Sequence, residues 1–326
     1  MTAVAVAAAR ALESERPDAL VDDPWAATLV RESGVAVPFP ERWPADLGDV
    51  PAMEHSMLLG AMYIGLRTRF IDDELRAGAV PQVVILGSGL DTRSWRLAWP
   101  AGTRLFELDS PGVVEFLDRT MDAAGAMPTA DRTALAADVT APWASAIVRA
   151  GLRPDHPTHW VLEGLLPYLG AHDQSALLDD IIALSAPGSR AVIERAPALT
   201  DTPETRERLQ TFSLATGIPF DDLLARTDPP DPAEVLTAAG WAVDEVAVHD
   251  LERRYSRPLR IDRDEPEEPS EPSQPSQRGG FVTAVRGERW RAPRAAARGD
   301  AGQHARRRES ARSHCHGAAP APIRVI

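Results

Sequence analysis

The stretch QVVILGSGLDTRSWRL, residues 82–97, decides the fold of this chain of 326 residues. Four apolar residues run into Gly87-Ser88-Gly89, and a helical pattern follows. A strand that ends in a Gly-x-Gly turn before a helix exposes backbone N–H groups at the carboxyl edge of a parallel sheet. Glycine permits the tight turn and the close approach of a ligand. The stretch therefore predicts the first strand of an α/β sheet and a ligand-binding turn at its end.

Short apolar runs that are typical of strands recur along the chain and alternate with helical patterns. This alternation is typical of a parallel sheet that is covered by helices on both faces. The predicted strands are residues 82–86, 103–108, 132–137, 158–162, 189–194, 241–248 and 280–285. Together they predict one doubly wound α/β domain with a seven-stranded, mostly parallel sheet.

Helical patterns dominate the segments that lie outside this alternation of strands and helices. One or two helices are predicted within residues 1–31, and a long helix spans residues 52–77. After the fifth strand, a helical insertion at residues 201–226 interrupts the strand pattern. A short helix is expected to begin at Asp231, because this residue can cap it and Pro232 suits its first turn.

Composition separates the folded domain from a tail. Residues 262–280 are acidic and rich in proline and serine, which predicts a solvated, low-complexity loop. Beyond residue 287 the chain is rich in arginine and alanine and shows no periodicity. We expect one domain over residues 1–287 and a disordered, arginine-rich tail over residues 288–326.

Charge and cysteine content exclude several classes of protein. The formal net charge of −13 argues against general nucleic-acid binding, because neutralising phosphates requires a basic surface. The single cysteine, Cys315, rules out an intramolecular disulfide. Its neighbours His314 and His316 are a poor geometry for a metal ion, so no metal site is expected. With neither a signal peptide nor an apolar run of 18 residues, the chain is expected in the cytoplasm, away from membranes.

A carboxylate at the end of the second predicted strand indicates what the glycine turn binds. Asp109 lies 20 residues after Gly89, where its carboxylate can accept hydrogen bonds from both hydroxyls of a ribose. Glu107 lies on the same face of that strand and remains an alternative. The pair of motifs predicts a nucleoside at this edge of the sheet.

The residues after the glycines favour a ligand that carries positive charge. A dinucleotide-binding turn continues to a third glycine and holds a pyrophosphate over the start of the helix. Here Thr92 occupies that position and Asp91, which would repel an anion, precedes it. S-adenosylmethionine has a nucleoside, a sulfonium, an ammonium and a carboxylate but no phosphate, so it is the expected ligand. A turn that binds nothing and a site for NAD or FAD remain the alternatives.

Three motifs together resemble the leucine carboxyl methyltransferase-like family of S-adenosylmethionine-dependent methyltransferases, in its bacterial branch. They are QVVILGSGLDTRSWRL, LFELDSPGVVEF (105–116) and WVLEGLLPYL (160–169). The likeness extends to ARALESERPDALVDDPWA (9–26), LRTRFIDDEL (66–75) and DPAEVLTAAGWAV (231–243), and covers residues 5–287. It implies a Rossmann-like class I methyltransferase fold with a helical N-terminal lid. The chain departs from the family at Phe116-Leu117, where members often carry a lysine, and in its tail.

The resemblance implies roles for matching positions at the nucleoside end of the cofactor. Gly87, Ser88 and Gly89 would approach the cofactor, and Asp109 would hold the ribose. Asp138 and Val139, after the third strand, would flank the adenine. Asp138 could instead be an ordinary turn residue.

It also implies roles at the methionine end. Asp91 would face the amino-acid part of the cofactor, and Arg67 would pair with its carboxylate. Glu163 would sit beside the sulfonium and the acceptor, and Tyr168 could position that acceptor. The plainer alternatives are a helix-capping role for Glu163, a charged helix face for Arg67 and a core position for Tyr168.

These roles predict a methyltransferase that acts on an oxygen, carboxylate or hydroxyl, of a small molecule or peptide. The catalytic candidates are Glu163 and Tyr168, but neither is an obvious base, which favours an acceptor that ionises by itself. Residues 1–60 and 196–230 lie outside the sheet rhythm and are expected to form the lid and the acceptor pocket. A non-catalytic, cofactor-binding scaffold and a nicotinamide-dependent oxidoreductase remain alternatives, and no pattern indicates the oligomeric state.

Overall fold

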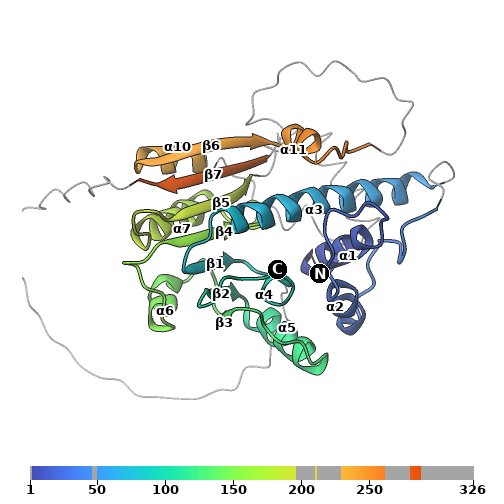
Figure 1. The fold of residues 1–326 in the computed structure, drawn as a ribbon, viewed down its shortest axis with the longest axis horizontal. Coiled ribbons are helices and arrows are strands. Elements are labelled where there is room, and N and C mark those ends of the chain that lie inside the picture. Colours follow the sequence, from blue (N-terminus) through green and yellow to red (C-terminus); the bar gives the residue numbers. More distant parts are fainter. Residues whose placement is uncertain (1, 46–49, 196–209, 211–228, 261–279, 288–326) are drawn as a thin grey trace, which may run out of the picture.

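The computed structural model describes residues 2–45, 50–195, 210, 229–260 and 280–287. Its centre is a seven-stranded sheet with the order β3-β2-β1-β4-β5-β7-β6 (Figure 1). The strands are β1 (Gln82–Leu86), β2 (Arg104–Asp109), β3 (Asp131–Ala136), β4 (Thr158–Leu162), β5 (Arg190–Arg195), β6 (Trp241–Ala247) and β7 (Gly280–Arg286). All seven predicted strands are confirmed, and each end lies within one residue of its prediction.

One strand breaks the parallel arrangement. β7 runs antiparallel to both of its neighbours, β5 and β6, whereas the other paired strands are parallel. The prediction of an α/β, mostly parallel sheet is therefore confirmed. The order of the strands reverses between β1 and β4, and a crevice forms at the carboxyl ends of strands at such a point.

Helices cover both faces of the sheet (Figure 1). They are α1 (Thr2–Ser14), α2 (Ala26–Ser33), α3 (Ala52–Ala77), α4 (Arg93–Arg96), α5 (Pro111–Ala123), α6 (Trp143–Arg149), the 3-10 turn η1 (Leu166–Tyr168), α7 (Ala171–Ala183), α10 (Pro232–Ala238) and α11 (Val248–Arg254). Side chains alternate along β1, because successive residues of a strand point to opposite faces. Val84 and Leu86 pack with α6, α7 and α10, whereas Val83 and Ile85 pack with α3 and α11.

The N-terminal helices lie beside the carboxyl edge of the sheet rather than on its faces (Figure 1). α1 packs along α3 through Ala9 and Leu12, which contact the cluster around Leu58 and Ala61. The predicted cap of the short C-terminal helix is present as well, since Asp231 accepts a hydrogen bond from the backbone N–H of Ala233 at 2.9 Å. None of the helices that the structure describes is long and apolar enough to cross a membrane.

Three sequence predictions fall outside the described residues. They concern the helical insertion at 201–226, of which only residue 210 is described, the loop at 262–280 up to Gly280, and the tail at 288–326. The division into a domain over residues 1–287 and a separate tail therefore remains a proposal.

β7 joins β6 to the rest of the sheet, so its core residue Phe281 should be essential for stability. Phe281 is fully buried and its ring lies 4.9 Å from that of Phe70 on α3. We expect Phe281→Ala to lower the free energy of unfolding by about 3–5 kcal/mol in urea titrations. Met127→Ala is the control, because Met127 is 80% exposed and its loss should change the free energy by less than about 0.5 kcal/mol. Equal effects of the two substitutions would contradict the placement of β7 in the core.

Candidate functional site

The glycine turn after β1 has no room for side chains. Gly87 and Gly89 have φ angles of +63° and +53°, in the left-handed region that glycine adopts readily. A Cβ atom on Gly87 would lie 2.8 Å from a methyl group of Leu165, and one on Gly89 would lie 3.4 Å from Ala3 of α1. The turn therefore needs glycine both for its backbone and because other parts of the chain pack against it.

Asp109 holds this turn from the end of β2. Its carboxylate accepts hydrogen bonds from the backbone N–H groups of Gly89 and Ser110, each at 2.7 Å. Burial raises the pKa of Asp109, and these two hydrogen bonds oppose the rise. Glu107, the alternative on the same strand, instead accepts hydrogen bonds from Ser94 and Arg132 away from the cavity. Of the two carboxylates, only Asp109 lines the cavity.

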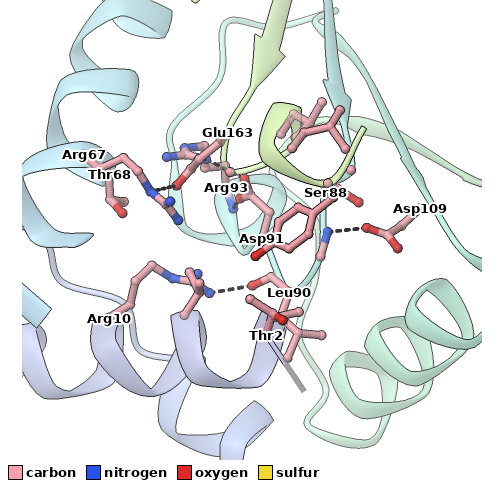
Figure 2. Close-up of a pocket in the computed structure, with 18 of the residues that line it drawn as sticks. Thr2, Arg10, Arg67, Thr68, Ser88, Leu90, Asp91, Arg93, Asp109 and Glu163 are labelled. Carbon is pink, nitrogen blue, oxygen red and sulfur yellow. Dashed lines mark hydrogen bonds and ion pairs between the residues drawn. The ribbon is translucent and has the colours of Figure 1, made fainter. Parts of the chain in front are cut away.

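A cavity opens over the turn, between α1, α3, the end of β2 and the loop after β4 (Figure 2). Arg67 and Asp109 lie on opposite sides of it. The predicted site residues that line the cavity are Arg67, Gly87, Ser88, Gly89, Asp91, Asp109, Glu163 and Tyr168. The sequence thus identified residues that the fold brings together from positions about 100 residues apart.

Two predicted residues are not part of the cavity lining. Asp138 is exposed, and its carboxylate accepts hydrogen bonds from the backbone and hydroxyl of Thr140 in its own turn, each at 2.8 Å. Val139 packs against the core cluster below. Their proposed place beside the adenine therefore lies outside the cavity that the described residues form.

Arg67 enters the cavity from α3 between two carboxylates. Its Nε lies 2.8 Å from Glu163 Oε1, and its Nη1 lies 3.0 Å from Glu194 Oε2. Arg69, two residues further along the helix, is 41% exposed and pairs with Asp73. The helix thus turns Arg67 inward and Arg69 outward, as the 3.6-residue period requires.

Arg93 is the site residue that sequence reasoning missed most clearly. This fully buried side chain at the start of α4 lies 2.7 Å from Asp72, 2.5 Å from Asp91 and 2.6 Å from Glu163. Burial alone would raise the pKa of Glu163, but Arg93 and Arg67 outweigh it and lower that pKa to about 2. The carboxylate of Glu163 is therefore ionised at neutral pH.

Arg10 of α1 also lines the cavity, although no sequence motif indicated a role for it. Its Nε lies 2.9 Å from Asp23, and its Nη2 donates to the backbone carbonyl of Leu90 in the glycine turn at 2.5 Å (Figure 2). Asp23 in turn accepts a hydrogen bond from Thr92 at 2.7 Å. The stretch ARALESERPDALVDDPWA contains both Arg10 and Asp23, but only the fold shows that they attach α1 to the turn.

The polar side chains that line the cavity are carboxylates, guanidinium groups and hydroxyls. Histidine, lysine and cysteine are absent from the lining residues that the structure describes. Nor does the described part of the chain hold a group of three or more histidine, cysteine, aspartate or glutamate residues that could bind a metal ion. The arrangement can orient a ligand between a carboxylate on one side and guanidinium groups on the other.

Comparisons with known proteins give consistent names. The family model described as leucine carboxyl methyltransferase matches residues 3–182. Two curated relatives are each named "Putative S-adenosyl-L-methionine-dependent methyltransferase". The one from Saccharopolyspora erythraea is 42% identical over 79% of this chain and 88% of its own length. The one from Mycolicibacterium smegmatis is 42% identical over 76% of this chain and 88% of its own length.

Among solved structures, a crystal structure described as "a putative methyltransferase from Thermobifida fusca YX" matches with a TM-score of 0.47 and 17% sequence identity. The match covers 86% of this chain and 94% of that chain.

The packing against the glycine turn can be tested by substitution. Gly87 and Gly102 both have positive φ, but nothing lies within 4 Å of a Cβ on Gly102. Gly102→Ala should therefore lower the free energy of unfolding by about 1–2 kcal/mol, because alanine is strained in the left-handed conformation. Gly87→Ala should cost about 1–3 kcal/mol more, because its Cβ would press on Leu165. Thermal or urea unfolding measures both, and equal costs would show that Leu165 does not constrain the turn.

Proposed function

The chain belongs to the leucine carboxyl methyltransferase family and is an S-adenosylmethionine-dependent methyltransferase, and we propose that it methylates an oxygen, carboxylate or hydroxyl, of a small molecule or peptide. The observation that carries the proposal is the cavity between Asp109 and Arg67 over the glycine turn. A nucleoside suits one side of this cavity and an amino acid suits the other.

The nucleoside side fits a ribose. Asp109 is already held by backbone N–H groups, so its carboxylate has a fixed position at the cavity. Carboxylate oxygens have lone pairs left after accepting one hydrogen bond each, and a ribose can supply two hydroxyl donors. We assign Gly87, Ser88 and Gly89 to the close approach of the nucleoside. Asp138 and Val139 keep their assignment to the adenine as a proposal from family resemblance alone.

The methionine side has donors without partners. Among the described residues, Thr68 Oγ1 and Arg93 Nη2 are buried and have no hydrogen-bond partner, and both residues line the cavity. Buried polar groups of this kind cost free energy unless a ligand or water satisfies them. A carboxylate accepts from such donors and from a guanidinium, which supports the assignment of Arg67 to the carboxylate of the cofactor. Asp91 and Glu163 would then lie near the ammonium and the sulfonium.

The protein's own contribution to catalysis is alignment and exclusion of water. Bound S-adenosylmethionine supplies an activated methyl group for in-line transfer to the acceptor. Glu163 remains ionised but is held by two arginines, and burial raises the pKa of Tyr168, so neither is suited to remove a proton. An acceptor oxygen that is already ionised, or that ionises readily, needs no such base.

The lid assignment follows from α1. Residues Thr2, Ala3, Val6 and Arg10 of this helix line the cavity, which supports a lid role for part of the segment 1–60. We propose that this segment forms the lid and, together with residues 196–230, selects the acceptor.

The function is tested by binding and then by product chemistry. S-adenosylhomocysteine should raise the melting temperature, whereas NAD should not, because a ligand that binds only the folded state stabilises it. With S-adenosylmethionine labelled in its methyl group, a panel of carboxylic acids, phenols, alcohols and amines should give labelled product with oxygen acceptors. Methyl esters release methanol in mild base and methyl ethers do not, which separates carboxylate from hydroxyl acceptors. Labelled product with amines alone would contradict methylation of oxygen.

Asp109→Asn tests the ribose site while keeping the shape of the side chain. The amide oxygen can still accept from Gly89, but the amide NH2 replaces the oxygen that accepts from Ser110, so the two charge-assisted hydrogen bonds to the ribose are lost or become neutral. At about 1 kcal/mol each, the dissociation constant for S-adenosylhomocysteine should rise about 30-fold in calorimetric titrations. Glu107→Gln on the same strand is the matched control and should stay within about twofold. A larger effect at Glu107 would mean that the other carboxylate binds the ribose.

A further inference from the structure

Glu194, near the end of β5, connects three segments around the methionine side of the cavity. Its carboxylate is buried, with 9% of the side chain exposed. One oxygen accepts from Arg67 Nη1 at 3.0 Å and from the backbone N–H of Gly164 at 2.7 Å. The other accepts a short hydrogen bond from the hydroxyl of Tyr63. A buried carboxylate with three donors has little freedom to rotate, so its position is fixed.

We propose that Glu194 is a positioning residue for methyl transfer, which aims Arg67 at the carboxylate of the cofactor and fixes the turn that carries Glu163. This inference rests on the proposed role of Arg67 and adds a residue that acts through it. Glu194 does not line the cavity itself, so it acts without touching the cofactor.

Glu194 restricts the orientation of Arg67 through one of its guanidinium nitrogens. Nη1 donates a hydrogen bond to Glu194, and Nε forms an ion pair with Glu163 but has no hydrogen-bond partner among the described residues, so Glu194 provides the hydrogen bond that orients the guanidinium. Arg67 lines the cavity, so its guanidinium can also reach a ligand there. Without Glu194, the long Arg67 side chain could rotate about its contact with Glu163. A pre-organised guanidinium loses less entropy on binding than a mobile one.

The effect on Glu163 follows from the next residue. Gly164 has φ of +63°, and its backbone N–H points at Glu194. A Cβ on Gly164 would lie 3.3 Å from Arg67 Nη1, so the turn and the guanidinium pack closely. The same carboxylate thus fixes Arg67 and the backbone that immediately follows Glu163.

Tyr63 sets the orientation of Glu194. It lies four residues before Arg67 on α3, so both side chains project from one face of the helix. Burial and the nearby Glu194 raise the pKa of Tyr63 well above its ordinary value, so the hydroxyl stays protonated and remains a donor. Tyr63 therefore holds Glu194, and its role is not that of a base.

The test compares two ligands, of which only one has the amino-acid group with its carboxylate and ammonium. S-adenosylhomocysteine carries the amino-acid group, and 5′-methylthioadenosine lacks it. Calorimetric titration gives a dissociation constant for each ligand. The ligand ratio, which is the dissociation constant of 5′-methylthioadenosine divided by that of S-adenosylhomocysteine, measures recognition of the methionine end. Glu194→Ala should weaken S-adenosylhomocysteine about 10-fold and 5′-methylthioadenosine less than twofold. Equal weakening of both ligands, or no change in either, would overturn the proposal.

Conservative variants separate positioning from charge. In Glu194→Gln the amide oxygen can accept from Arg67 and Gly164, and the hydroxyl of Tyr63 can turn to accept from the amide. This variant should therefore keep the ligand ratio within about threefold of the original protein. If it loses as much as Glu194→Ala, the charge of Glu194 matters rather than its position, and the proposal is wrong. If Glu194→Ala does not fold, Tyr63→Phe takes its place and should lower the ratio about threefold, and an unchanged ratio overturns the proposal.

Two further variants complete the design. Glu245→Ala is the control, because Glu245 on β6 pairs with the neighbouring Arg195 and should leave the ratio unchanged. Arg67→Lys keeps a buried charge but lacks the planar fork, so it should lower the ratio about 10-fold. An unchanged ratio in Arg67→Lys overturns the proposed role of Arg67 and the inference with it. A lowered ratio in Arg67→Lys with an unchanged ratio in Glu194→Ala overturns the inference alone.

Discussion

The buried ion pair between Arg93 and Glu163 is the contact on which the site depends. It joins α4, at the end of the glycine turn, to the loop after β4, and its atoms lie 2.6 Å apart. From this pair the network extends through Arg67 to α3 and through Asp72 back to the same helix. Removing one member would leave a buried charge without its partner, which typically costs about 3–5 kcal/mol. The network therefore fixes the relative positions of three segments rather than adding net stability.

A second, smaller network ties the N-terminal helices to the same turn. Asp23 accepts from Arg10 and Thr92, and its other oxygen accepts from the first backbone N–H groups of the turn into α2. Because Arg10 also binds the carbonyl of Leu90, α1 is attached to the loop that it covers. The cover and the floor of the cavity are thus linked by buried polar contacts.

The sequence predicted the strands and the glycine turn that lines the cavity because those signals are local. A run of apolar residues ending in two glycines predicts a strand and a turn, and Asp109 follows from the strand next to it. The roles of Arg93 and Glu194 could not be predicted, because each depends on partners 70 and 127 to 131 positions away. For Asp138, the sequence predicted the position in the chain but not what the side chain contacts. Its place after a strand was read correctly, but its side chain serves its own turn.

The network also revises why the site suits a sulfonium ligand. The sequence attributed the exclusion of phosphate to Asp91 alone, but Asp91 shares Arg93 with Asp72 and Glu163, so its charge belongs to a larger network. The exclusion of phosphate then depends on the net charge of the whole network, in which three guanidinium groups pair with four carboxylates. Its members are Arg67, Arg93, Arg96, Asp72, Asp91, Glu163 and Glu194. With the carboxylates ionised, one negative charge is left over beside the cavity. S-adenosylmethionine carries two positive charges and one negative, so the same balance that disfavours a pyrophosphate favours this ligand.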